Sequence, residues 1–218
     1  IEALWIEKTE TASRVRGRVE KILDWATVRG YRTGENPARW KSHLDQVLPA
    51  PAKVKGGKKQ PALPFTQMNE FALDLRKVSG KSATALEITI LTALRTNAVI
   101  NADWSEIDFD NRIWTIPASR MKGDRNKTEE FVVPLSNRVV ELFQKTPESK
   151  RHGLIFPGTK YGKPISQAAL LKCIQDLNEK RTDNGLPRWV DPKQGNRDIV
   201  PHGFRSTFRD WAAEMTNT

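Results

Sequence analysis

A stretch rich in proline, glycine and lysine constrains the fold of this chain more than any other feature. Residues 49–64 read PAPAKVKGGKKQPALP, with prolines near both ends, two adjacent glycines, four lysines and no acidic residue. Prolines stiffen such a segment, adjacent glycines free it, and nothing in it is expected to build a core. The sequence therefore predicts a linker between a unit of residues 1–48 and a larger unit of residues 65–218.

The smaller unit is predicted to be helical. Apolar residues recur at helical spacing between Thr9 and Gly30, and a second apolar set follows Asn36-Pro37. The chain begins with isoleucine rather than methionine. We therefore expect a fragment of a longer protein, with this unit the last part of a small helical domain.

The larger unit combines helical patterns with short strand patterns. Two strand candidates, 106–109 and 112–116, flank the turn pair Asp110-Asn111, and a third covers 130–135. Helices are expected at 66–78, at 82–95, after the N-cap candidates Ser136 and Ser166, and at 202–214. The last helix carries an apolar stripe of Phe204, Phe208 and Trp211. These patterns predict a mainly helical α+β fold with a small antiparallel three-stranded sheet packed on helices.

The net charge indicates the class of binding partner, and the cysteine content indicates the cellular compartment. The 218 residues carry a formal charge of +10 with a pI of about 9.8, which favours nucleic acid over a membrane surface as a partner. The sequence contains no run of the length of a membrane-spanning helix and no signal-peptide pattern. The single cysteine, Cys173, excludes an internal disulfide and fits a reducing cytosol.

Four basic side chains, far apart in sequence, suit one kind of chemistry. Arg95 follows an apolar helical segment, Lys122 follows a strand candidate, and His202 lies three residues before Arg205. Two arginines can neutralise the oxygens of a phosphodiester transition state, and a lysine and a histidine can transfer its protons. This chemistry requires no metal and no cofactor. Each residue alone has an ordinary structural interpretation, so the hypothesis depends on their order and context.

Several stretches give the chain a specific resemblance. It resembles the tyrosine recombinases, in particular prophage integrases of the satellite-phage type, in the segments LTALRT at 91–96, DWSEID at 103–108, WTIP at 114–117, RMK at 120–122, VPLS at 133–136 and PHGFRSTFR at 201–209. The upstream run from Thr11 to Ala38 resembles their core-binding domain. The resemblance implies catalytic roles for Arg95, Lys122, His202 and Arg205.

The same resemblance implies a clamp around double-stranded DNA at attachment sites. Phosphate contacts are expected from Arg14, Arg16 and Arg18 and from the linker lysines Lys53, Lys55, Lys58 and Lys59. Other integrase protomers in a synaptic tetramer and accessory DNA-bending or directionality factors are the implied protein partners. The implied location is the bacterial cytoplasm, at the nucleoid.

Two departures from the family pattern are visible. The family usually has an acidic residue three positions after the first arginine, where this chain has Ala98. The family nucleophile is a tyrosine some tens of residues beyond the second arginine, and the only tyrosines here are Tyr31 and Tyr161. We therefore expect no nucleophile within residues 1–218 and no DNA cleavage by this chain alone.

Two other functions remain open. The chain could be a non-catalytic DNA-binding remnant of a decayed prophage integrase, a reading that Ala98 favours. A generic RNA-binding domain ranks lower, because the aromatic platform motifs of such domains are missing.

Overall fold

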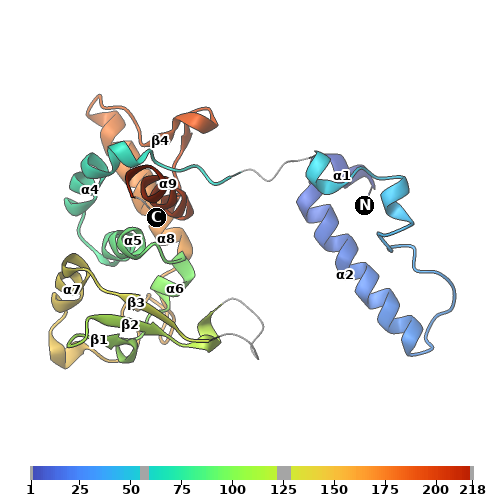
Figure 1. The fold of residues 1–218 in the computed structure, drawn as a ribbon, viewed down its shortest axis with the longest axis horizontal. Coiled ribbons are helices and arrows are strands. Elements are labelled where there is room, and N and C mark those ends of the chain that lie inside the picture. Colours follow the sequence, from blue (N-terminus) through green and yellow to red (C-terminus); the bar gives the residue numbers. More distant parts are fainter. Residues whose placement is uncertain (1, 55–58, 122–128, 217–218) are drawn as a thin grey trace. The chain divides into compact units, whose positions relative to one another are not determined.

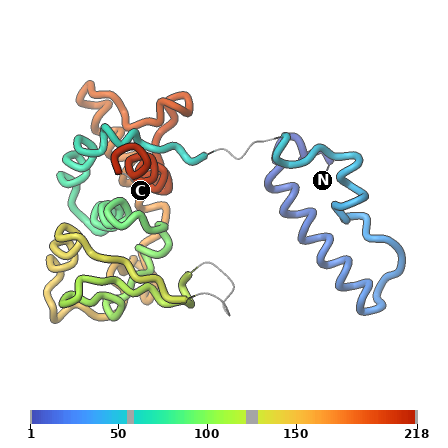
Figure 2. Tube along the Cα trace, viewed as in Figure 1, coloured from blue at the N-terminus to red at the C-terminus, as the bar shows by residue number. Residues whose placement is uncertain are grey.

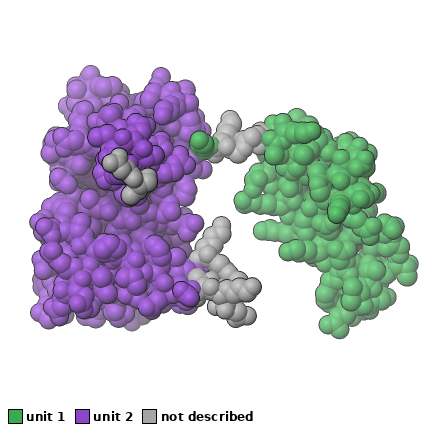
Figure 3. Space-filling model, viewed as in Figure 1, with its two compact units in different colours: residues 1–59 green, residues 60–218 purple. Residues whose placement is uncertain are grey.

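The computed structural model describes residues 2–54, 59–121 and 129–216 and falls into two compact units, residues 1–59 and 60–218 (Figures 1, 2 and 3). The division lies within the predicted linker, residues 49–64. Among the described helices, none combines the length and apolar composition needed to cross a membrane.

The first unit is a small helical body with a small core. Its elements are α1 (Glu2–Glu7), α2 (Thr9–Val28), a 3₁₀ turn at Leu44–Gln46 and α3 (Pro51–Val54). Trp5 is fully buried, stacks on Trp40 with ring centroids 5.2 Å apart, and donates to the carbonyl of Pro49 at 2.8 Å. On α2, Ile22, Trp25 and Val28 remain exposed.

The predicted linker contributes to both cores, contrary to expectation. Residues 51–54 form α3, and Val54 packs against the small cluster of Trp5, Ala12 and Leu48. At the other end, Leu63 is 1% exposed and belongs to the core of the second unit. Each terminal apolar residue is close enough to a unit to be buried by it, which composition alone could not indicate.

The second unit is built around one helix, α5 (Lys81–Thr92). Six of its twelve residues are buried, and it packs against helices before and after it in the chain. These neighbours are α4 (Met68–Arg76), α6 (Thr96–Ile100), α7 (Asn137–Gln144), α8 (Gln167–Asp183) and α9 (Phe204–Met215). In Figure 1, α5 lies between α9 and the sheet. The largely apolar sequence of this helix thus correctly predicted a buried position.

The predicted three-stranded sheet is confirmed. Strands β1 (Ile107–Asp108), β2 (Ile113–Ile116) and β3 (Phe131–Pro134) pair antiparallel in that order. Trp114 lies opposite both Ile107 and Val133 and is fully buried. A second hairpin, β4 (Val190–Asp191) with β5 (Arg197–Asp198), was not predicted because two-residue strands leave no alternation to detect.

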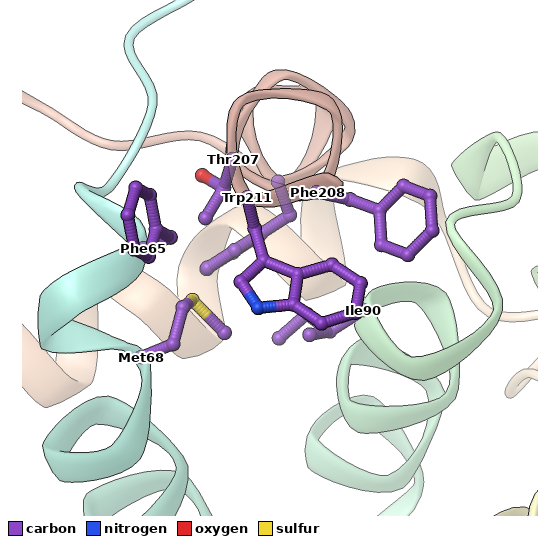
Figure 4. A pocket seen from close by; sticks show the side chains of 7 residues that line it. Phe65, Met68, Ile90, Thr207, Phe208 and Trp211 are labelled. Carbon is purple, nitrogen blue, oxygen red and sulfur yellow. The ribbon is translucent and has the colours of Figure 1, made fainter. Parts of the chain in front are cut away.

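The apolar stripe of the last helix is buried only at its start. Phe204 is 3% exposed, whereas Phe208 is 48% and Trp211 is 42% exposed. Together with Phe65, Met68 and Ile90 these side chains line an open groove between α9, α4 and α5 (Figure 4). Of the predicted apolar stripe, only Phe204 is therefore buried in the core, whereas Phe208 and Trp211 line the groove.

Candidate functional site

The first arginine of the candidate site lies in a tight turn between two helices. Helix α5 ends at Thr92, earlier than the predicted residue 95, because Ala93 adopts the left-handed conformation with φ of 50°. Leu94 anchors the turn in the core, and Arg95 then takes an extended conformation as the N-cap residue of α6. This geometry leaves the Arg95 side chain exposed, just after a buried helix end.

The second arginine and the histidine lie on a different segment. Pro201 opens a 3₁₀ turn, Pro201–Gly203, in which His202 is exposed, and Arg205 occupies the first turn of α9. His202 was expected on the same helix as Arg205 and instead precedes it. Both the 3₁₀ turn and α9 pack against α5, the helix that leads to Arg95.

Arg205 reaches the turn that carries Arg95. Its Nη1 donates a hydrogen bond to the carbonyl of Ala93, across 112 residues of sequence. Partial burial, together with the nearby charge of Arg95, lowers the pKa of Arg205. Within the described residues, neither guanidinium forms a salt bridge. Two neighbouring guanidinium groups that have no carboxylate partner repel each other, and an anion such as a phosphodiester would offset this repulsion.

Lys122 lies outside the described residues, but the residues just before it are well anchored. Arg120 donates to the carbonyls of Ala98 and Asn101 and to the carboxylate of Glu106. Glu106 also accepts from the Trp114 indole at 2.9 Å. Arg120 therefore joins the end of α6 to Glu106 and, through Glu106, to Trp114 of β2. The sequence analysis did not single it out, and only its position beside Lys122 could have drawn attention to it.

Ala98 occupies the place where the resembled family has an acid. It is half-buried on α6 and packs against the core. In this chain the Ala93 carbonyl orients Arg205, and no part of that hydrogen bond depends on position 98. Because backbone carbonyls are invisible to sequence motifs, this substitute could not have been found from the sequence.

The predicted DNA-contacting arginines of the first unit differ in their surroundings. Arg14 is exposed and forms an ion pair with Glu10, and Arg18 is exposed. The Arg16 side chain is only 13% exposed; it bonds Glu20 and the carbonyl of Ala38 and lies over the Trp40 ring. These contacts correct the expectation for Arg16, whose guanidinium is engaged inside the unit.

The linker lysines are only partly described. Lys53 is exposed in the last turn of α3, and Lys59 is exposed beside the boundary of the units. Lys55 and Lys58 lie outside the described residues. The two tyrosines are both exposed: Tyr31 in the first unit and Tyr161 in a turn of the second.

Comparison with family models gives two matches that together cover most of the chain. The model described as "Phage integrase family" matches residues 63–217, and the model described as "Phage integrase central domain" matches residues 1–43. The two matched ranges are separated by residues 44–62.

Among curated proteins, the integrase of Enterobacteria phage P4 is 32% identical over 214 residues, covering 93% of this chain and 44% of that protein. The integrase of Shigella phage Sf6 is 30% identical, covering 94% of this chain and 49% of that protein. Prophage integrase IntZ of Escherichia coli K12 is also 30% identical, with coverage of 91% and 43%. The chain thus spans about half the length of the curated relatives it matches.

Solved structures share the fold at lower identity. The Tn1549 transposon integrase in complex with a circular intermediate DNA aligns with a TM-score of 0.62 and 18% identity, covering 95% of this chain and 68% of that one. A lambda integrase tetramer bound to a Holliday junction aligns with a TM-score of 0.58 and 15% identity, covering 98% and 58%.

Proposed function

The chain belongs to the phage integrase family of tyrosine recombinases, and on this premise we propose that it is the DNA-gripping part of a site-specific integrase. The whole protein would bind attachment-site DNA and recombine it through a phosphotyrosyl intermediate. Residues 1–218 would contain the surfaces that bind DNA and the arginines that bind the scissile phosphate.

The observation that carries this proposal is the pairing of Arg95 with Arg205. The two side chains come from distant segments, and partial burial together with the nearby charge of Arg95 lowers the pKa of Arg205. Their forked N–H groups can each donate two hydrogen bonds to phosphate oxygens. In a phosphoryl-transfer transition state these donors would stabilise the charge that accumulates on the non-bridging oxygens.

The remaining roles follow from the chemistry of transesterification. A tyrosine oxygen would attack the scissile phosphorus, forming a 3′-phosphotyrosyl bond while the bond to the 5′-oxygen breaks. Lys122 would protonate the leaving 5′-oxygen, and His202 would act in proton transfer at the phosphate. We assign the nucleophile to a part of the protein outside residues 1–218, so this chain alone should not cleave DNA.

Partners and location are part of the same proposal. The lambda integrase neighbour is a tetramer on a Holliday junction, which supports a synaptic tetramer of protomers here. Accessory DNA-bending or directionality factors would act with it. We place the protein in the bacterial cytoplasm, at the nucleoid.

A second candidate is a DNA-binding remnant of a decayed prophage integrase that has lost its chemistry. Ala98 favours this candidate, since it removes a carboxylate that supports the arginines in the resembled family. The hydrogen bond from Arg205 to the Ala93 carbonyl favours the enzyme, because it orients the Arg205 guanidinium without that carboxylate.

Covalent trapping separates the two candidates. Duplexes that the protein selects from a random pool would be nicked near the centre and incubated with the whole protein. The integrase should form a protein–DNA adduct, and Arg95→Ala and Arg205→Ala should each reduce it at least 100-fold while most DNA binding remains. An adduct unaffected by these variants would refute the assigned site. Bound duplexes without any adduct would instead favour the remnant.

A further inference from the structure

The segment that enters the second unit lies directly against the turn that carries His202. Gly203 is buried, and a Cβ atom built on it would lie 1.9 Å from the carbonyl oxygen of Pro61. Real Cβ atoms do not approach backbone oxygens so closely, so only glycine fits here without displacing one of the two segments. Gly203 has a negative φ of −60°, so the requirement is for space and not for backbone conformation.

Three hydrogen bonds fix the same segment, which we call the seat (residues 61–63). The backbone N–H of Val200 donates to Pro61 at 3.4 Å, and the Thr207 hydroxyl donates to the Leu63 carbonyl at 2.6 Å. The N–H of Ala62 donates to the carboxylate of Asp191 at 2.9 Å. The seat is therefore bonded on both sides of the turn, before His202 and after Arg205.

The contacts of the seat are shielded from solvent. Pro61, Leu63, Gly203 and Thr207 are all buried, and the Asp191 side chain caps the neighbouring 3₁₀ turn at Lys193. Although burial opposes it, hydrogen bonds from Ala62, Gln194 and Lys193 lower the pKa of Asp191, so its carboxylate stays ionised near neutral pH. In Figure 2 the cyan chain near residue 61 passes beside the red helix α9.

We propose that the seat positions His202 and Arg205 on the phosphate, with Gly203 and Thr207 as the positioning residues. This inference rests on the proposed function of the arginine pair. The turn that contains His202 has only three residues, and it contacts both the seat and α5. Displacing the seat by the width of a methyl group would move an imidazole and a guanidinium that must act within hydrogen-bond distance of one phosphate.

The seat also continues the basic linker. Lys59 precedes Pro61 by two residues in the sequence. If the linker lysines hold the DNA backbone, the same short segment is tied to DNA at one end and to the catalytic turn at the other. The placement of His202 and Arg205 thereby becomes sensitive to how the linker is held.

The test measures binding of inorganic phosphate at the site of residues 1–218 by NMR of the histidine ring protons. The chain has three histidines, so His202 can be assigned with His202→Gln, and His43 and His152 report non-specific effects. At constant ionic strength, phosphate should shift the His202 signal, and Arg205→Ala should abolish the shift. If the wild-type chain shows no such shift, the proposed phosphate site itself fails and the inference falls with it.

Given a wild-type shift, Gly203→Ala and Thr207→Val should each weaken phosphate binding at His202 at least 5-fold. Thr207→Ser, which keeps the hydroxyl, should retain wild-type affinity. The matched control is Gly158→Ala, since a Cβ at Gly158 would meet the Pro164 carbonyl oxygen at 2.6 Å, away from the seat. That variant should lose stability but not phosphate affinity.

Wild-type affinity in both Gly203→Ala and Thr207→Val would overturn the inference, as would an equal loss in Gly158→Ala. If Gly203→Ala does not fold, the comparison of Thr207→Val with Thr207→Ser decides, because these side chains differ by little more than the hydroxyl. Phosphate binding is measured at a temperature well below the unfolding midpoint of each variant, so that every variant is folded. Under these conditions a seat that only stabilises the fold would leave the phosphate-induced shift of the His202 signal unchanged.

Discussion

At the scale of single residues, some arginines bond a buried carboxylate and others have no carboxylate partner among the described residues. Arg76 and Arg138 both bond the carboxylate of Glu87, which is 7% exposed. Arg95 and Arg205 have no carboxylate partner in the described structure. Sequence alone cannot make this distinction, because a carboxylate 51 residues away neutralises Arg138.

The Glu87 cluster predicts a pH-dependent stability. Burial alone would raise the pKa of Glu87, but Arg138 and Arg76 lower it below the ordinary 4.5. Its stabilising contribution is therefore present above pH 4.5 and is lost as pH falls through the lower folded-state pKa. Glu87→Gln should cost about 2 kcal/mol of unfolding free energy near pH 7, measured by urea denaturation.

The difference between wild type and Glu87→Gln should shrink as the pH is lowered from 4.5 towards 3. Glu10→Gln is the control, since Glu10 pairs with Arg14 on the surface and both side chains are more than 70% exposed. It should change stability little at any pH. A Glu87→Gln deficit that is the same at pH 3 and pH 7 would contradict the assigned ion cluster.

Arg16 and Arg18 should separate stability from DNA binding. Arg16→Ala removes two hydrogen bonds inside the first unit and should speed hydrogen exchange of the α2 amides. Arg18→Ala should leave that exchange unchanged and weaken DNA binding at low salt. If Arg16→Ala weakens DNA binding without affecting exchange, the internal role given to Arg16 is incorrect.

At the scale of elements, the periodicity of apolar residues predicted the long helices, whereas local backbone geometry determined where they begin and end. The apolar sequence at 82–95 correctly indicated a buried helix, but its end was misplaced because Ala93 adopts a conformation usually left to glycine. Ser136 was correctly predicted as an N-cap, with its oxygen accepting from Val139. Ser166 occupies the same position on α8 without a side-chain bond. The sequence motif is the same at both, and only the structure separates them.

The candidate site shows the same limit. Arg95, His202 and Arg205 were singled out as candidates from sequence motifs, whereas the backbone atoms that contact this region could not be. The Ala93 carbonyl that holds Arg205 and the Pro61 carbonyl that excludes a side chain at Gly203 are backbone atoms from distant segments. Such contacts depend on tertiary packing and leave no pattern in the chain.

Arg120 provides the prediction at the scale of elements. Its guanidinium bonds two carbonyls at the end of α6 and the carboxylate of Glu106, which also accepts from Trp114 of β2, and several acceptors at once suit a planar fork. Arg120→Lys keeps the charge but cannot span these acceptors, so it should cost about 1–3 kcal/mol in urea unfolding. Arg112→Lys, at an exposed position between β1 and β2, is the control and should be nearly neutral. Equal midpoints for both variants would show that the fork is unimportant.

At the scale of the whole molecule, charge is distributed unevenly between the units and the segment that joins them. Residues 49–64 carry four lysines and no acidic residue, whereas the rest of the chain has 32 basic and 26 acidic residues. The two units are compact, and the family models match them separately. If both units bind DNA, as we propose, the segment that joins them lies near the phosphate backbone, and its positive charge would favour that contact.

The linker lysines should therefore contribute affinity without contributing sequence preference. Replacing Lys53, Lys55, Lys58 and Lys59 by alanine should weaken binding to selected and random duplexes about equally, because phosphate contacts do not read bases. Each lost phosphate contact should reduce the slope of log affinity against log salt by about 0.9, so the full variant loses at most about 3.6. Fluorescence anisotropy at several salt concentrations measures both quantities.

A matched variant with the same net charge separates the linker from the overall charge of +10. Alanine at Lys145, Lys150, Lys172 and Lys180 removes four positive charges elsewhere on the second unit. If the linker binds the DNA backbone directly, the linker variant should reduce the slope of log affinity against log salt several times more than this control does. Lysines that contact phosphates release counterions, whereas distant lysines only change the overall electrostatic field. Equal losses would mean that only net charge matters. A loss confined to the selected duplex would mean that the linker reads sequence, and in either case the backbone role would have to be abandoned.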